Sequence, residues 1–561
     1  MKHGSIFKPT ALLLVVLIAS FSLFGCSGAG TQTTAAPATS AATSAVSDSS
    51  SGQTTAGVVK EHHLTILGKD RRYDCAPFSD RDQYPTWQAV EKLLAENGIT
   101  CEFELVPKEQ YPTAIQARMA AASDLPDIVN LIDLDDQTVL DMGAQGSIID
   151  VKAAIDQYSN GNTLAMWEKY WPDATKLITT PDGKIFWYPS FSNRQLNGKA
   201  TEGTGFALQY RGDWAKNLGL SAPKTIDDLY TMMKAFRDQD ANGNGTADEL
   251  ALVSVDGFLN GIAQSFGLAP NLFDISNKAD KAVTPWYQPG IKQYIEFMKK
   301  CVAEGLIDAS LIGATGEVSD QKITENKGGL VFNYIQQNWL EPMTGLDTAD
   351  YVPVMPKADG LEPVFEREPS ALVYEKYCVT KNCQDVEGAV KLFDTLYTED
   401  YAQLSMWGVE GTSFKWDGDR KVAIYPDYTD EQLAEAKALV GHSLCGHTVF
   451  PVVNIQEEWA DVLTAQKVSQ AKQDYEISMQ SFTDDYSTSP ALALPTEDER
   501  AVADKYATTL NTYSSELLVN LILGNTSIDD LDASIKEMQT MGLDEMLKVY
   551  QSRHDRFTAT K

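Results

Sequence analysis

Oxygen-bearing side chains recur at every second position in the stretch RDQDANGNGTADEL, residues 237–250. A calcium ion takes about six to eight oxygen ligands, so a short calcium-binding loop must present oxygens at this spacing and turn sharply between them. Gly243 and Gly245 can adopt the positive φ angles that such a turn requires. The sequence therefore predicts a calcium site here.

Two ligand frames fit this stretch. In an EF-hand frame, the ligands come from Asp238, Asp240, Asn242, the carbonyl of Asn244, and Glu249. In a tighter frame, they come from Asp240, Asn242, Asn244, the carbonyl of Thr246, Asp248 and Glu249. A helical pattern precedes the stretch and a strand pattern follows it, whereas an EF-hand sensor needs a second helix to move. We therefore expect the tighter frame and a structural calcium ion; the alternatives are an Asn/Gly-rich turn without metal and a regulatory calcium site.

A second group of metal-binding residue types is His442, Cys445 and His447 in the segment HSLCGH. Because this group lacks a second ligand pair, we interpret it as ordinary loop sequence. The cysteines after residue 26 are few, and their spacing is not that of a disulfide framework. They are Cys75, Cys101, Cys301, Cys378, Cys383 and Cys445.

The elements that would position such sites begin with an alternation of strands and helices. The segments HLTILG (63–68), ITCEFELV (99–106) and IVNL (128–131) have strand patterns. Between them, residues 84–98 and 112–122 show helical spacing, and Asn97–Gly98 is a helix-stop signal. Strands that alternate with helices predict a parallel sheet covered by helices.

A second α/β region follows residue 189. Strand patterns occur at 207–211, 250–255 and 328–333, and Thr225 is an expected N-cap for the helix before the calcium loop. A further strand is predicted at 371–380 and a helix at 385–397, and the chain from about residue 429 has a largely helical pattern. No internal repeat of fixed period occurs, which argues against solenoids and propellers.

The N-terminus predicts export. Lys2 and Lys8 precede an apolar run, residues 11–25, which is too short to span a bilayer and is typical of a signal peptide. The run ends in LFGC, which resembles a bacterial lipobox and implies that Cys26 carries the lipid, including palmitate; an ordinary secretory signal is the alternative. Residues 27–60, rich in Ser, Thr and Ala, are predicted to be a flexible tether after the lipoprotein signal peptide 1–26.

Length and charge narrow the class of protein. The chain has 561 residues, enough for two domains or one large two-lobed unit. A formal net charge of −32 argues against nucleic acid or an anionic membrane surface as a partner.

Six landmarks in order carry a resemblance to a known family. With the lipobox and the calcium loop, SDLPDIV (123–129), PDGKIFWYP (181–189), QYRGDWAKNLGL (209–220) and WGVEGTSFKW (407–416) make the chain similar to the extracellular solute-binding proteins of carbohydrate ABC importers. The group it resembles most is the calcium-containing lipoproteins of Gram-positive bacteria. The resemblance implies an α/β, two-lobed periplasmic-binding-protein-like fold (type II), with hinge crossovers and a ligand cleft between the lobes. Lobe 1 would comprise residues 61–188 plus about 372–428, and lobe 2 residues 189–371 plus about 429–561.

The same resemblance implies a function without catalysis. The protein would bind an extracellular sugar or oligosaccharide and deliver it to the transmembrane subunits of a permease while lipid-anchored to the cell membrane. A separate ATPase is implied, because the chain has no GxxxxGK[ST] motif. The alternatives are a secreted carbohydrate-active, glycosidase-like enzyme, which needs a pair of carboxylates that no local motif announces, and an adhesion or scaffold module with calcium loops.

Sugars are held by aromatic side chains stacked on their apolar faces and by polar side chains at the rim of a cleft. The resemblance places loops of both lobes near several such residues, for which core packing is the alternative. The predicted ligand-binding residues are Asp127, Trp187, Tyr188, Tyr210, Arg211, Asn333, Tyr334, Gln337, Trp339, Trp407 and Trp416. Trp87 and Trp171 are predicted to be structural, and Lys184, Arg194 and Arg211 are candidates to meet the carboxylate of an acidic sugar.

Overall fold

The structure of the protein is a computed structural model. It describes residues 60–70, 78–193, 195–196, 199–200, 206–253, 261–307, 316–334, 350–366, 371–412, 415–417, 422–424, 449–455, 474–475, 487–489 and 492–559. The predicted lipid attachment at Cys26, the tether and the HSLCGH segment lie outside these residues.

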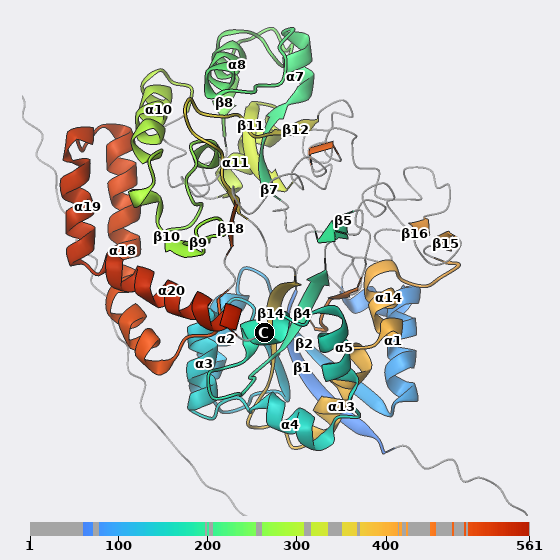
Figure 1. Cartoon of the computed structure of the whole chain (residues 1–561). Helices are drawn as coiled ribbons and strands as arrows, with labels where there is room; N and C mark the ends of the chain where they lie inside the picture. The colour runs from blue at the N-terminus through green and yellow to red at the C-terminus, as the bar shows by residue number, and fades with distance from the viewer. Residues whose placement is uncertain are drawn as a thin grey trace, which may run out of the picture. The chain divides into compact units, whose positions relative to one another are not determined.

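A six-stranded sheet forms the first lobe (Figure 1). Its strands, in spatial order, are β17 (Val453–Asn454), β4 (Tyr188–Asn193), β14 (Ala371–Val379), β3 (Ile128–Asn130), β1 (His62–Asp70) and β2 (Ile99–Pro107). Helices lie on both sides of it: α1 (Pro85–Glu96), α2 (Tyr111–Ala121), α3 (Asp136–Ala144), α4 (Val151–Tyr158), α5 (Asn162–Tyr170), α6 (Ala174–Ile178), α13 (Val386–Leu396) and α14 (Glu399–Trp407). The sequence prediction for this lobe is confirmed for its strands and helices up to residue 131. The parallel arrangement holds for β1 with β2 and β3, whereas β14 runs antiparallel to β3 and β4.

The apolar faces of these elements meet in one core. Trp87 on α1 and Trp171 after α5 are almost completely buried, as predicted. Phe450, just before β17, stacks on Trp87 with ring centroids 5.8 Å apart. This contact draws a late segment of the chain into the first lobe.

A four-stranded sheet forms the second lobe, with the order β12 (Tyr351–Val354), β7 (Phe206–Arg211), β11 (Gly328–Tyr334) and β8 (Leu250–Leu252). Its helices are α7 (Gly212–Asn217), α8 (Ile226–Asp238), α9 (Ile262–Ser265), α10 (Ile291–Ala303) and α11 (Gly316–Thr324). Thr225 caps α8 in a reciprocal capping box with Asp228, as the sequence predicts. Trp214 and Phe236 pack edge to face in the core beneath this sheet, with centroids 5.4 Å apart.

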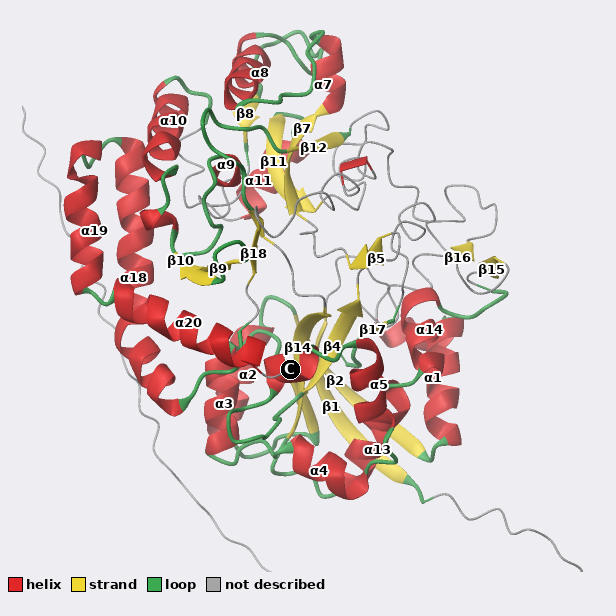
Figure 2. Cartoon of the chain, viewed as in Figure 1, coloured by secondary structure: helices red, strands yellow, loops and turns green. Residues whose placement is uncertain are grey.

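Three long C-terminal helices complete the described chain (Figure 2). They are α18 (Glu497–Leu523), α19 (Leu531–Thr540) and α20 (Leu543–Ala559). They pack on α10 and on a third sheet of order β10 (Lys281–Val283), β9 (Asp274–Ser276), β18 (Ser487–Ser489) and β13 (Phe365–Glu366). Two further pairs of strands are β5 (Gln195–Leu196) with β6 (Lys199–Ala200) and β15 (Lys415–Asp417) with β16 (Val422–Ile424). In the described part of the chain, no helix combines the length and apolarity needed to cross a membrane.

The chain leaves the six-stranded sheet through three neighbouring strands, β17, β4 and β14. The Ser190 hydroxyl on β4 donates a hydrogen bond to Glu375 on β14 and accepts one from the backbone N–H of Val452, at 2.8 Å, before β17. Tyr377 on β14 donates to the carbonyl of Phe450 at 2.6 Å. These hydrogen bonds tie the three segments together side by side.

The strand pairing differs from the predicted lobe boundaries in two places. Residues 189–193 and 453–454, both expected in lobe 2, lie in the sheet of lobe 1. The physical reason is burial, because Phe191 and Val453 are fully buried in the first core. A two-residue strand has no periodicity that a sequence pattern could reveal. The other boundaries stay predictions.

Candidate functional site

The predicted calcium loop connects α8 to β8, so a helix precedes it and a strand follows it, as expected. Gly243 and Gly245 have φ angles of 74° and 90°. The side-chain oxygens of Asp240, Asn242 and Asn244 turn inward and accept backbone N–H groups two to five residues further on, at 2.8–2.9 Å. The loop is therefore wound tightly around its own oxygens.

Glu249 closes this loop with a carboxylate that is only 3% exposed. Its Oε1 accepts the backbone N–H of Asn242 at 2.8 Å, whereas its buried Oε2 has no hydrogen-bond partner. A buried carboxylate oxygen without a partner is costly unless a cation or a donor satisfies it. This oxygen fits a calcium ion held in the tighter frame.

Two other acids of this stretch, Asp248 and Asp238, already have partners within the protein. Asn244 and then Lys327 hydrogen bond to Asp248, at 3.2 and 3.1 Å, and lower the pKa of its carboxyl group. Asp238, the first ligand of the EF-hand frame, ends α8 and pairs with Arg237 at 2.6 Å. Among the described residues, no three His, Cys, Asp or Glu side chains are gathered closely enough to form a metal group. Asparagine and carbonyl oxygens would therefore have to complete the shell.

Arg211, predicted to contact ligand, is 1% exposed and fully engaged elsewhere. Its Nε and Nη2 donate to Asp213 at 2.8 and 2.6 Å, and its Nη1 donates to the side chain of Asn326 at 2.6 Å. The guanidinium group also lies over Trp214, 4.5 Å from the ring centroid. Asn242 of the calcium loop donates to the carbonyl of Asn326 at 3.0 Å, so Arg211 and the loop are joined through one residue.

Trp187, Tyr188 and Tyr210 are buried, with 2%, 0% and 6% exposure. The Tyr188 ring stacks on Phe393 with centroids 3.7 Å apart, and its hydroxyl has no hydrogen-bond partner. This burial favours the core-packing alternative at these positions over contact with a ligand. The aromatic residues of the first crossover are part of the lobe core, and their predicted contact with a ligand stays a prediction.

Asp127, just before β3, forms hydrogen bonds to Thr65 of β1 and to Thr380, just after β14. Its Oδ2 accepts the backbone N–H and the hydroxyl of Thr65, both at 2.8 Å. The backbone carbonyl of Asp127 accepts the N–H of Thr380 at 2.9 Å. These bonds give Asp127 a structural task at the junction of β1, β3 and β14, and its predicted binding role stays a prediction.

The remaining predicted ligand residues lie on β11 and in the segments around α14. Asn333 is half-buried on β11, and its carbonyl accepts the side-chain amide of Gln209 at 2.8 Å. Gln337 and Trp339 lie outside the described residues, as do the side chains of Tyr334, Trp407 and Trp416. Their role as ligand contacts stays a prediction.

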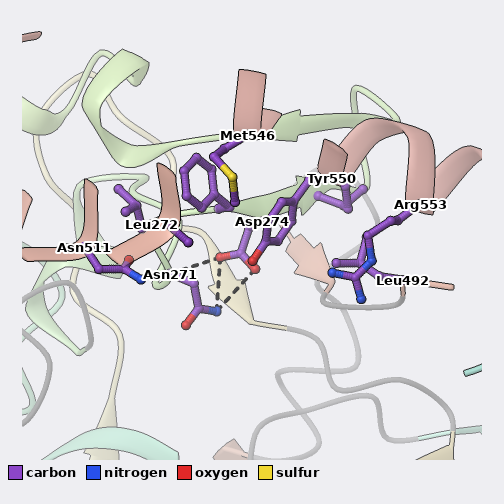
Figure 3. Close-up of a pocket in the computed structure, with 11 residues that line it drawn as sticks. Asn271, Leu272, Asp274, Leu492, Asn511, Met546, Tyr550 and Arg553 are labelled. Carbon is purple, nitrogen blue, oxygen red and sulfur yellow. Dashed lines mark hydrogen bonds between the residues drawn. The ribbon is translucent and has the colours of Figure 1, made fainter. Parts of the chain in front are cut away.

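A cavity that the sequence did not reveal lies among the C-terminal helices (Figure 3). Its volume is about 540 Å³. Its walls come from residues 271–275, Leu492, α18 and α20, segments too distant in the sequence for any local motif. Polar side chains of Asp274, Tyr550 and Arg553 face it together with apolar ones.

Two described carboxyl groups, those of Asp385 and Glu499, have lowered pKa values. Burial opposes the ionisation of Asp385, but the hydrogen bonds from His62 and from the N–H of Gly388 prevail and lower its pKa. Burial also raises the pKa of Glu499, but the hydrogen bonds from Arg556 outweigh burial and lower this pKa to about 2. A glycosidase needs one carboxyl group with a raised pKa as its general acid, the opposite direction.

Comparison with known proteins gives a consistent picture. The sequence profile of the bacterial extracellular solute-binding protein family matches residues 79–403. The fructooligosaccharide ABC transporter substrate-binding protein FusA of Streptococcus pneumoniae is 24% identical over 466 residues, 79% of this chain and 82% of FusA. The polygalacturonan/rhamnogalacturonan-binding protein YtcQ of Bacillus subtilis is 24% identical over 394 residues, 67% of this chain and 74% of YtcQ.

Solved structures share the fold. FusA in complex with kestose has a TM-score of 0.69 at 20% identity and covers 89% of this chain and 100% of its own. An HMO-binding, ABC-transporter-associated solute-binding protein of Bifidobacterium longum infantis has a TM-score of 0.65 at 20% identity, covering 89% of this chain and 99% of its own. An EF-hand mutant of FusA bound to fructo-nystose also matches, with a TM-score of 0.69. The predicted two-lobed α/β fold is thereby confirmed.

Proposed function

Since the chain belongs to the bacterial extracellular solute-binding protein family, we propose that it is the substrate-binding component of an ABC importer for an oligosaccharide. The observation that carries the proposal is the match to FusA with kestose bound, which extends over 89% of the chain and includes both lobes. The curated relatives FusA and YtcQ both bind saccharides. The ligand of this chain is therefore an extracellular sugar or oligosaccharide.

Capture follows from two lobes joined by a few strands. A ligand that contacts both lobes binds the closed arrangement more tightly and shifts the population towards it. The predicted contacts other than those found buried in a lobe core are Asp127, Asn333, Tyr334, Gln337, Trp339, Trp407 and Trp416 in this proposal. The buried side chains of Tyr188 and Arg211 stabilise the lobes from which these segments extend.

The transport cycle ends when the protein releases its sugar unchanged. The closed protein delivers its sugar to the transmembrane subunits of a permease, and a separate ATPase supplies the energy. No bond of the sugar needs to break in this cycle. The competing proposal, a glycosidase, would require a raised pKa.

We place the protein on the extracellular face of a Gram-positive cell membrane. The lipobox-like LFGC supports a lipidated Cys26, and residues 27–60 supply a tether for the binding lobes. A single tethered copy would capture solute next to its permease.

We also propose that the 240–249 loop holds a structural calcium ion. The ion would supply positive charge beside Glu249, whose Oε2 lacks a partner, and the side chains of Asp240, Asn242, Asn244 and Asp248 with the Thr246 carbonyl would complete its ligands. The FusA EF-hand mutant supports a metal loop in a protein of this fold. In this chain the loop also steadies Arg211 through Asn326.

The direct test is calorimetry and thermal melting of the purified protein with a panel of oligosaccharides. We expect one class of saccharide to bind and to raise the melting temperature, with no product on chromatography. Trp416→Ala should weaken that binding about tenfold, because a stacked aromatic is worth about 0.5–1.5 kcal/mol beyond the area that it buries. Tyr158→Ala on α4, which removes an exposed aromatic away from the predicted contacts, is the matched control.

Two results would reject the proposal. Turnover of a saccharide would make the protein an enzyme. The absence of any binding across neutral and acidic oligosaccharides would remove saccharide transport as its function.

A further inference from the structure

The cavity among the C-terminal helices is lined from two opposite walls (Figure 3). One wall is the turn before β9 and β9 itself, residues 271–275, and the other is formed by α18 and α20. None of its lining residues is among those that the sequence predicted to bind ligand or metal. At about 540 Å³ it is within the range of about 300–1,000 Å³ typical of small-molecule sites.

Arg553 on α20 places a positively charged guanidinium group at this cavity. Its Nε donates to the carbonyl of Ala493 at 2.8 Å. Its two Nη groups have no acceptor among the residues that the structure describes. Arg553 is partly buried, and burial lowers its pKa. A guanidinium group in this state gains most from an anion that can accept two parallel hydrogen bonds.

Glu499 and Asp136, whose charges act on Arg553, do not supply this anion, because each already pairs with another basic residue. Glu499 already receives both Nη atoms of Arg556, at 2.5 and 2.6 Å. Asp136, the other acid whose charge acts on Arg553, pairs with Lys376 at 3.2 Å. The guanidinium group lies over the ring of Tyr550, 5.8 Å from its centroid, but no acid in the described part of the chain forms an ion pair with it.

Asp274 at the start of β9 and Asn511 on α18 offer a carboxylate and an amide to the same cavity. Asp274 is 1% exposed and accepts the backbone N–H of Asn271 at 3.0 Å and its side-chain amide at 3.2 Å. Asn511 on α18 is exposed and lines the same cavity. Figure 3 shows Tyr550 between Asp274 and Arg553 in this view, with Met546 nearby. Carboxylate and amide groups beside an aromatic ring suit the hydroxyls and apolar face of a sugar.

The charges of the two walls select among ligands. A simple inorganic anion would satisfy Arg553 but would meet the carboxylate of Asp274 on the other wall. A neutral saccharide would satisfy the Asp274 wall but leave the guanidinium group unpaired. A sugar with a carboxylate at one end and hydroxyls at the other satisfies both.

We propose that this cavity binds a carboxylated saccharide unit, with its carboxylate on Arg553 and its hydroxyls on Asp274 and Asn511. The proposal rests on the proposed function and names an acidic saccharide as its ligand class. It assigns a recognition residue to α20, an element that carries none of the contacts predicted from the sequence.

The test compares α-1,4-linked tri-galacturonate, neutral galactotriose and inorganic phosphate as ligands of the mature protein, by titration calorimetry and thermal melting. We expect tri-galacturonate to bind at least tenfold more tightly than galactotriose, and phosphate not to stabilise the protein. Arg553→Gln should weaken tri-galacturonate binding about tenfold to hundredfold, because a charge-assisted bidentate pair is lost. Lys548→Gln, which removes a positive charge from an exposed position on the same helix, is the matched control.

A second variant keeps the test decisive if Arg553→Gln does not fold. Asn511→Asp adds a negative charge at an exposed position of the cavity and should weaken the binding of tri-galacturonate more than that of galactotriose. If galactotriose or another neutral oligosaccharide binds and tri-galacturonate does not, this inference is overturned and the proposed function stands. Stabilisation by phosphate equal to that by tri-galacturonate also overturns it. If no saccharide binds, the proposed function fails with it.

Discussion

Replacement of Glu499 by glutamine removes the charge that joins the start of α18 to the end of α20. Glu499 is the third residue of α18, and it receives the backbone N–H of Thr496 at 2.8 Å in a capping box. Arg556 on α20 approaches both carboxylate oxygens, at 2.5 and 2.6 Å. Glutamine retains the shape of the side chain but loses one acceptor and the charge, so Arg556 is left without its counterion.

The magnitude follows from the pKa of Glu499. Burial raises this pKa, but the hydrogen bonds from Arg556 and Thr496 outweigh burial and lower it from 4.5 to about 2. Such a change corresponds to about 3 kcal/mol of folding free energy at neutral pH. Because the Arg556 side chain is 31% exposed, solvent screens the pair, and we expect a loss of about 2 kcal/mol.

The sign of the pH dependence is fixed by the same shift. A carboxyl group whose pKa is lowered by folding contributes its full stability above its unfolded pKa, about 4.5, and loses it as the pH falls towards 2. Urea denaturation of wild type and Glu499→Gln should therefore differ by about 2 kcal/mol at pH 7 and converge between pH 4.5 and pH 2.

The control for this prediction is Glu497→Gln, which removes an exposed carboxylate from the same first turn of α18. It should cost about 0.5 kcal/mol or less. A loss in Glu499→Gln that is no larger than this, or one that persists unchanged at pH 2.5, would refute the reasoning.

Three further predictions concern other parts of the chain. Tyr188→Phe removes a buried hydroxyl that has no partner, so the melting temperature should stay constant or rise and saccharide affinity should not change; a tenfold loss of affinity would make Tyr188 a ligand contact after all. Asp394→Ala leaves four donors of residues 159–163 without their acceptor. We expect it to lower the free energy of unfolding in urea by about 3 kcal/mol, and a decrease below about 1 kcal/mol would show that these hydrogen bonds do not stabilise the fold. Chelation of calcium should lower the melting temperature of the wild type but not of Asp240→Ala; an equal response of both would separate the metal from this loop.

Much of the fold was predictable because its elements carry strong local signals. The helix of α1 ends at a predicted stop, Asn97–Gly98, and α8 begins at a predicted N-cap, Thr225. Strands β1, β2 and β3 pair in parallel, as an alternation of strands and helices implies. What could not be predicted was β17, since two residues have no period and their place is decided by the burial of Phe450 against Trp87.

The candidate site was harder to predict from the sequence. A motif shows which residue types occur together but not whether their side chains are turned inwards, and the GKIFWYP motif places Trp187 and Tyr188 in the core. Arg211 shows the same difficulty, since Asp213 and Asn326 take up its guanidinium group. The cavity around Arg553 depends on tertiary packing alone, because Asp274 and Arg553 are separated by most of the second half of the chain.

The adjacency of β17, β4 and β14 in one sheet has a mechanical consequence. Three separate linkers would let two bodies bend, slide and splay independently, but strands that are hydrogen bonded edge to edge behave as one ribbon. Such a ribbon resists splaying, since each ladder would have to break, and yields most readily to twist about its own length. We therefore expect the lobes to rotate about this ribbon more readily than they slide past each other.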